Sequence, residues 1–374
     1  MKYLFAVSCL LLMSTHFCQA NVVWDKEINQ FRTSVAVELN DNLYNTTIQP
    51  RQSTLLSAQA QLNTLRLFDG YGLYLPASIS SRQVSYDSEL NNNDVVFEPQ
   101  LHVFLSESTE IDFIIRHHDV LKINGDSQAE FLTSRFLDET FNSAQLSLSL
   151  GRAQQLQFLN FDLGQSTRKQ TQSNGIFTDI QTNYINSLYG HQLTEDTDWL
   201  LHGTYQNEQR LALNSMLYEM GLGFKTDFGS THQFKLVTGW FERSGDSKSK
   251  GFYWQLEDNW LINELHQLRF LTSQRSEVAT SVKALTQLRT RAEVFYQLAI
   301  SQQHSLNATI NYQTIELDNT SRMNRSWQWQ LRWQWQILQD IIAKLSFNQL
   351  KTKDNYLLAD KVQNRWDLNL EYVW

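Results

Sequence analysis

The chain has 374 residues, of which 31 are basic and 39 acidic, and this net charge of −8 disfavours a uniformly basic nucleic-acid binder. Its only two cysteines, Cys9 and Cys18, fall within the first twenty residues. That segment has an early positive charge, an apolar stretch over residues 3–13 and a small residue, Ala20, at its end, which is typical of a secretory signal. We therefore expect cleavage near Ala20, a short periplasmic segment over residues 21–30, and a mature chain without thiol chemistry.

No run of 18 apolar residues follows Ala20, so the sequence predicts no transmembrane helix. The mean hydropathy of −0.42 suits a soluble protein. It suits a transmembrane β-barrel equally well, because barrel strands alternate lipid-facing apolar residues with lumen-facing polar ones. The order of residues along the chain therefore has to separate these two classes.

The predicted strands share an alternation of apolar and polar residues with a period of two. The first begins at Phe31, and further examples lie at residues 216–224, 252–256 and 306–312. The clearest is 326–338, where one face carries Trp327, Trp329, Leu331, Trp333, Trp335 and Ile337 and the other carries four glutamines and Arg332. Such rows of tryptophan favour lipid over the core of a soluble β-sandwich, which is the alternative.

Two kinds of connection separate these strands. About eight short turns alternate with about nine longer polar loops, including residues 124–139, 165–174 and 207–214. The sequence thus predicts an all-β fold over residues 31–374: a transmembrane, antiparallel, up-and-down β-barrel of about 18 strands, within a range of 16 to 18. We expect the short turns on the periplasmic side and the longer loops outside the cell.

The sequence shows no local motif of an enzyme. It has no phosphate-binding glycine loop and no nucleophile elbow, and His117 and His118 would point to opposite faces of a strand. We therefore expect no catalytic activity, cofactor or metal site.

Basic residues gather on the predicted inner faces of the later strands, and arginine presents a planar donor fork to carboxylates and phosphates. A basic track for an acidic solute is one interpretation, and pairing with lumenal carboxylates is the other. The residues of this proposed track are Arg269, Arg275, Arg289, Arg291, Arg332 and Lys344. The longest loop also carries apolar residues, and we expect Phe131 and Phe136 to fold into the lumen as a constriction.

The sequence resembles the outer-membrane β-barrel porin-like proteins associated with bacterial exopolysaccharide export. The resemblance covers residues 37–46, which read Val-Glu-Leu-Asn-Asp-Asn-Leu-Tyr-Asn-Thr, the strand that follows from Ser53, and the terminal Tyr372-Val373-Trp374. It implies an exit pore for a polysaccharide that a periplasmic polysaccharide-export protein delivers. It also implies that barrel-assembly machinery recognises Leu370, Tyr372 and Trp374.

The function expected from the sequence is therefore an outer-membrane pore of a Gram-negative bacterium, surrounded by lipid, that translocates an exported polysaccharide. A general or solute-specific porin for sugars or anions is the alternative. A structural or adhesion barrel with a filled lumen is an alternative of another class. The sequence leaves the direction of transport, the solute and the oligomeric state open.

Overall fold

The computed structural model describes residues 24, 26–45, 50–123, 136–151, 156–173, 175, 177–211, 213–246, 248–279, 286–318, 322–355 and 360–374. The strands are β1 (Ile28–Asn40), β2 (Ser53–Phe68), β3 (Tyr71–Val84), β4 (Asn92–Phe97), β5 (Gln100–Ser106), β6 (Thr109–Ile123), β7 (Phe136–Leu150), β8 (Gln157–Gln172), β9 (Phe177–Thr194), β10 (Thr197–Arg210), β11 (Leu213–Phe228), β12 (His232–Gly245), β13 (Ser249–Asn263), β14 (His266–Val278), β15 (Thr286–Ala299), β16 (His304–Leu317), β17 (Met323–Leu338), β18 (Ile341–Asp354) and β19 (Lys361–Val373). A 3-10 turn, η2 (Ser88–Leu90), precedes β4. No helix among these residues is long and apolar enough to cross a membrane.

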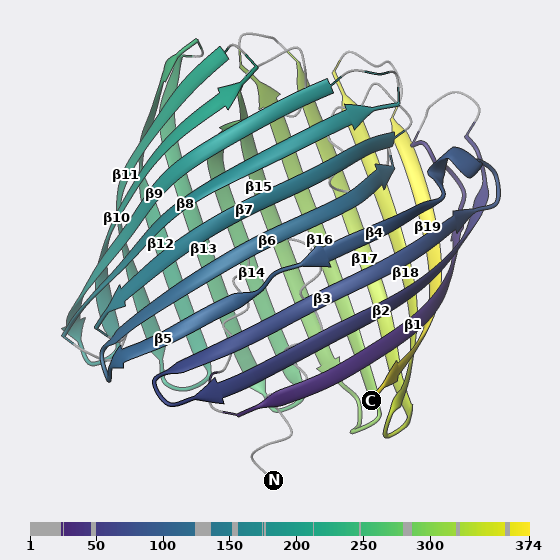
Figure 1. Cartoon of the computed structure of the whole chain (residues 1–374), viewed down its shortest axis with the longest axis horizontal. Helices are drawn as coiled ribbons and strands as arrows, with labels where there is room; N and C mark the ends of the chain where they lie inside the picture. The colour runs from purple at the N-terminus through teal and green to yellow at the C-terminus, as the bar shows by residue number, and fades with distance from the viewer. Residues whose placement is uncertain are drawn as a thin grey trace.

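The strands form one closed antiparallel barrel, because β1 pairs with both β2 and β19 (Figure 1). β4 and β5 lie end to end between β3 and β6, so they make one strand of the wall. The described residues thus build the predicted wall of eighteen strands. The short turns lie at one end, the turn end, where β1 begins and β19 finishes, and the longer connections lie at the opposite loop end.

The strands are longer than the sequence pattern predicts. Apart from the two halves β4 and β5, they run from 13 to 18 residues. β8 includes most of the predicted loop 165–174, and β10 and β11 continue through most of 207–214. The ladder there continues as far as Arg210 opposite Leu213. Backbone pairing therefore continues where the side chains no longer alternate between apolar and polar.

The alternation along the strands separates two faces of the wall. On β17 the rings of Trp327, Trp329 and Trp333 are exposed on the outer face, and the glutamines and Arg332 between them lie on the less exposed inner face. The outer face is thus apolar and the inner face polar, as expected for a barrel with lipid outside and water inside.

Three glycines mark a close approach between β11 and its neighbours. A Cβ atom on Gly223 would lie 2.1 Å from the carbonyl oxygen of Leu236, and one on Gly239 would lie 2.1 Å from that of Met220. At Gly221 a Cβ would collide with the hydroxyl of Tyr253, at 2.2 Å. Only glycine fits where strands approach this closely, which is typical of a barrel corner.

The ladder has two openings at the loop end, which we call the two seams. Pairing of β13 with β14 stops at Gln274, although β14 continues to Val278. Pairing of β4 with β6 stops at Asp119, although β6 continues to Ile123. At both seams a side chain replaces a ladder bond. Gln274 Nε2 donates to the Phe252 carbonyl at 2.9 Å, and Asp94 Oδ1 accepts from the Leu121 amide at 2.9 Å.

Candidate functional site

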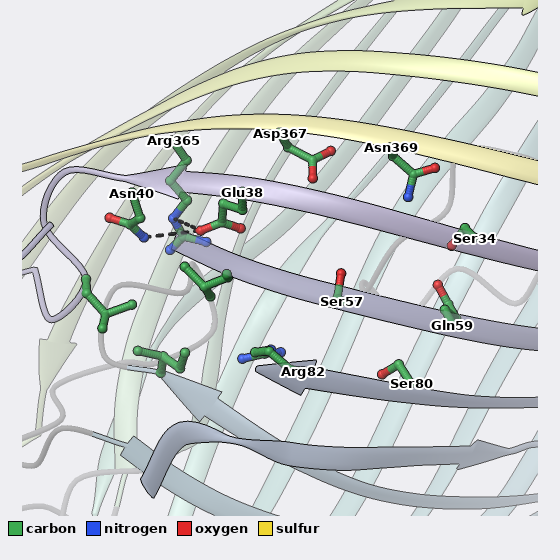
Figure 2. Close-up of a pocket in the computed structure, with 13 residues that line it drawn as sticks. Ser34, Glu38, Asn40, Ser57, Gln59, Ser80, Arg82, Arg365, Asp367 and Asn369 are labelled. Carbon is green, nitrogen blue, oxygen red and sulfur yellow. Dashed lines mark hydrogen bonds and ion pairs between the residues drawn. The ribbon is translucent and has the colours of Figure 1, made fainter. Parts of the chain in front are cut away.

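A polar pocket of about 220 Å³ lies in the lumen near the loop end (Figure 2). Its walls come from the inner faces of four neighbouring strands, β19, β1, β2 and β3. The lining side chains are Ser34, Glu38, Asn40, Leu43, Leu55, Ser57, Gln59, Ser80, Arg82, Ile123, Arg365, Asp367 and Asn369. Hydroxyl and amide groups dominate this set, and the charged groups number two acids and two bases.

The charges of the pocket are compensated within the protein. Glu38 Oε1 lies 4.0 Å from Arg365 Nε and also accepts from Asn40 Nδ2 at 3.2 Å. Arg82 Nη2 lies 3.6 Å from Asp94 Oδ2. The pocket therefore contains charged groups of both signs rather than an excess of one sign.

An apolar cluster covers the pocket on the loop side. Leu43 and Tyr44 of the β1–β2 connection pack there against strand and loop residues, and Phe136 packs on the cluster from β7. The other members are Leu55, Val84, Leu90, Leu121 and Ile123. Phe136 thus lies against a lumenal cluster, whereas Phe131 lies outside the described residues. A constriction formed by Phe131 and Phe136 remains a prediction. The packing of Leu43 and Tyr44 in this cluster was not expected from the sequence.

Leu121 and Ile123 reach this cluster because of the seam between β4 and β6. Lys122, which lies between them in the sequence, points into the lumen. Leu121 and Ile123 would therefore point outward if this end of β6 continued in the plane of the wall. Beyond the seam they instead pack on Leu55 and Val84, which are inner-face residues of β2 and β3. The last residues of β6 therefore turn inward over the pocket.

The β14–β15 hairpin folds inward at the other seam. Ala279, just beyond β14, is fully buried and packs on Ile315 and Leu317 of β16. Its carbonyl accepts a hydrogen bond of 3.1 Å from Arg210 Nη1, which belongs to β10. Contacts with both β10 and β16 place Ala279 on the lumenal side of the wall at the loop end.

Arg243 of β12 holds this hairpin to the wall. Its side chain is 0% exposed, and it donates to Ser276 of β14 through Nε to Oγ at 3.0 Å and through Nη2 to the carbonyl at 3.2 Å. It also donates to Ser215 Oγ at 2.9 Å and forms an ion pair with Glu208. One buried guanidinium thus joins β10, β11, β12 and β14.

The structure places all six residues of the proposed basic track on inner faces of β14, β15, β17 and β18. Three of them pair with carboxylates: Arg269 with Glu293 (3.2 Å), Arg289 with Glu277 (3.1 Å) and Lys344 with Glu371. The other three have different surroundings: Arg275 donates to Gln255, Arg291 to Gln313 (3.2 Å), and Arg332 interacts electrostatically with Asp367. The track is therefore a row of guanidinium groups interleaved with acids and amides, and its action on a solute stays a prediction.

At the turn end, a side chain from before β1 enters the lumen. The Trp24 ring stacks on His102 with centroids 4.7 Å apart and an angle of 17° between the planes. His102 Nδ1 lies 2.6 Å from Asp112 Oδ1, which fixes the imidazole. Gly72 leaves room for the indole, because a Cβ there would lie 2.5 Å from Trp24 Cε3. This contact could not be predicted from the sequence, since Trp24 precedes the alternating pattern.

The remaining expected residues lie as the alternation predicts. His118 points inward and contacts Glu98 Oε1 at 2.7 Å, whereas His117 contacts Asn142 on the opposite face. Leu370, Tyr372 and Trp374 share the outer face of β19 and its end. Among the described residues, no group of three or more histidines or acids is arranged to hold a metal ion.

Comparisons with known proteins agree on the fold. No protein-family model matches the sequence, and no curated protein does. Among solved structures, the outer membrane protein OpdK from Pseudomonas aeruginosa aligns with a TM-score of 0.52 and 12% identity, over 93% of this chain and 99% of that one. OpdQ from the same organism aligns at 0.51 and 10% identity, and OccAB4 from Acinetobacter baumannii at 0.50 and 10%, each over 94% of this chain and 99% of the other. The chain thus shares the closed-barrel fold of outer-membrane proteins.

Proposed function

We propose that the protein is an outer-membrane channel for the passive diffusion of small polar solutes. The observation that carries this proposal is the closed barrel with an apolar outer face and a polar inner face, whose loop end is narrowed by segments folded inward. Lipid is the partner that fits the outer face, and water with dissolved solutes fits the inner face. The shared fold supports an outer-membrane location.

Diffusion of small solutes fits these observations better than polysaccharide export. The inward hairpin at Ala279 and the cluster around Leu43 both occupy the loop end, where an extended polymer would have to leave. One OpdK structure contains vanillate, a small carboxylate. The fold shared with OpdK, OpdQ and OccAB4 does not support polysaccharide export or its periplasmic partner.

Conductance of the purified barrel in a planar lipid bilayer tests the proposal. We expect stepwise increases of current as single barrels insert in potassium chloride. Folded protein that inserts without conducting would contradict the proposal and favour the structural barrel with a filled lumen. In cells, deletion of the gene should slow uptake of small solutes; normal uptake together with polysaccharide trapped in the periplasm would favour export.

A further inference from the structure

The lumenal pocket combines compensated charge with neutral hydrogen-bonding groups. Its two acids and two bases face partners inside the protein, as in the approach of Arg365 to Glu38. A solute with a single charge would gain attraction from one member of such a pair and repulsion from the other. Electrostatics therefore favour an uncharged occupant over an ion at this wall of the lumen.

Neutral groups form ordered rows across the pocket. Ser34 on β1 lies opposite Gln59 on β2, which lies opposite Ser80 on β3. One row nearer the loop end, Asn369 on β19 and Ser57 on β2 lie on either side of Ala36. Neighbouring strands are about 4.8 Å apart. Hydroxyl and amide groups are thus repeated at the spacing of neighbouring strands, and Figure 2 shows that they face the same pocket.

Solute hydroxyl groups match the chemistry of these rows. A hydroxyl both donates and accepts, so it can bond to the serine, asparagine and glutamine side chains that line the pocket.

The apolar part of the pocket lining suits the carbon skeleton of a hydroxyl-bearing solute. Leu43, Leu55 and Ile123 bring aliphatic carbon to the loop side of the pocket. A sugar ring presents C–H groups on its faces and hydroxyls around its edge, which matches an apolar cover over polar rows. The volume of about 220 Å³ is below that of drug-sized sites, roughly 300–1,000 Å³, so it fits one ring rather than a chain.

We propose that this pocket binds an uncharged, hydroxyl-rich solute of monosaccharide size during its passage, an inference that rests on the proposed channel function. The contacts are a few neutral hydrogen bonds. A channel needs such weak binding, because a tightly bound solute would not leave. The neutral pocket wall and the guanidinium-rich wall of β14 and β15 then give the lumen two chemically different sides.

Glucose is the probe for the test, with the whole barrel in a planar bilayer. We expect glucose to reduce the potassium chloride current of the native protein. Asn369→Leu and Ser57→Ala should each raise the half-blocking concentration about fivefold, which corresponds to the ~1 kcal/mol of one net hydrogen bond. Asn311→Leu is the matched control, because Asn311 lies on the inner face of β16 and outside the pocket. It should leave the glucose block unchanged.

A second measurement does not depend on conduction. Saturation-transfer NMR of glucose with the barrel in nanodiscs should show contact for the native protein and for Asn311→Leu, and lose it in the Asn369→Leu/Ser57→Ala double variant. Normal current without glucose block or NMR contact would overturn the inference and leave the channel function intact. A current that benzoate reduces and glucose does not would show that the lumen binds anions instead. NMR contact with glucose in a protein that carries no current would support the binding site and contradict the proposed channel function.

Discussion

Arg243 is a fully buried cation whose partners lie on three other strands. Beyond the seam, the ladder no longer joins β14 to β13, so the hydrogen bonds from Arg243 to Ser276 take over part of that connection. Glu208 supplies the compensating charge and is itself buried. Removing one partner of such a pair leaves the other charge buried without compensation, which costs more than the pair contributes.

Arg243→Met should lower the free energy of unfolding by roughly 3–5 kcal/mol, because Glu208 is left buried without its cation. Urea unfolding followed by tryptophan fluorescence measures this difference. The Arg243→Met/Glu208→Leu double variant should recover most of the loss. Arg66→Met is the control, since Arg66 and Glu27 form an exposed pair and the expected change is below about 1 kcal/mol. A loss no larger in Arg243→Met than in Arg66→Met would contradict the assigned role.

Gly72 makes the space that Trp24 occupies, so Gly72→Ala should displace the indole from His102. Fluorine NMR of protein labelled with 5-fluorotryptophan measures the displacement, with the resonance of position 24 assigned from Trp24→Phe. We expect this resonance to move towards that of an indole in water. In Gly203→Ala, the new Cβ would meet the Ser187 hydroxyl at 3.1 Å, and the resonance should stay in place. An unmoved resonance in Gly72→Ala would show that the contact is not formed.

The adjacent strands β14 and β15 concentrate guanidinium groups on one side of the lumen. Pairing with Glu293 and Glu277 reduces the net charge of this wall without removing its donors. The cluster around Leu43 lies on the side formed by β1, β2, β3 and β6. We therefore propose that charge selectivity depends mainly on β14 and β15, and solute contact mainly on β1, β2 and β3.

Replacing four arginines of the β14, β15 and β17 wall by glutamine should shift the ion selectivity of the channel. In the variant with Arg269, Arg289, Arg291 and Arg332 changed to Gln, we expect the preference for chloride over potassium to fall, because the carboxylates remain while their cations are lost. The reversal potential under a salt gradient gives this preference. Gln328→Asn on the same face keeps neutral chemistry and should have no effect. An unchanged reversal potential in the quadruple variant would exclude the basic track.

At the scale of the whole barrel, the sequence was sufficient to predict the wall. Alternation such as that of residues 326–338 predicts which side chains lie on the outer face. The spacing of the turns predicts the number of strands, eighteen. The seams could not be predicted, because they depend on where pairing between strands stops, and side chains such as Asp94 then replace the backbone. The pocket was missed for a related reason. Its residues come from β19 and from β1, which meet only when the barrel closes.

Trp374 adds contacts where β19 closes the barrel on β1. The Trp374 amide donates to the Phe31 carbonyl at 2.8 Å, and its ring packs edge-on against Tyr372, with centroids 4.6 Å apart. We expect Trp374→Ala to reduce the amount of folded barrel in the outer membrane, whereas Trp374→Phe should retain it, because an aromatic ring remains. The ratio of the folded to the heat-unfolded band on a semi-native gel measures this. Equal folding of the alanine and phenylalanine variants would remove the assembly role.

The two seams divide the barrel into halves of different stiffness. Around the turn end, the backbone hydrogen bonds form an unbroken hoop, and any change of diameter there requires strands to separate. Around the loop end, the hoop is split beside β6 and beside β14, and side-chain contacts such as those of Arg243 bridge the cuts. Widening of the mouth would therefore break a few side-chain hydrogen bonds and leave the ladder intact, whereas widening of the turn end would break the ladder itself.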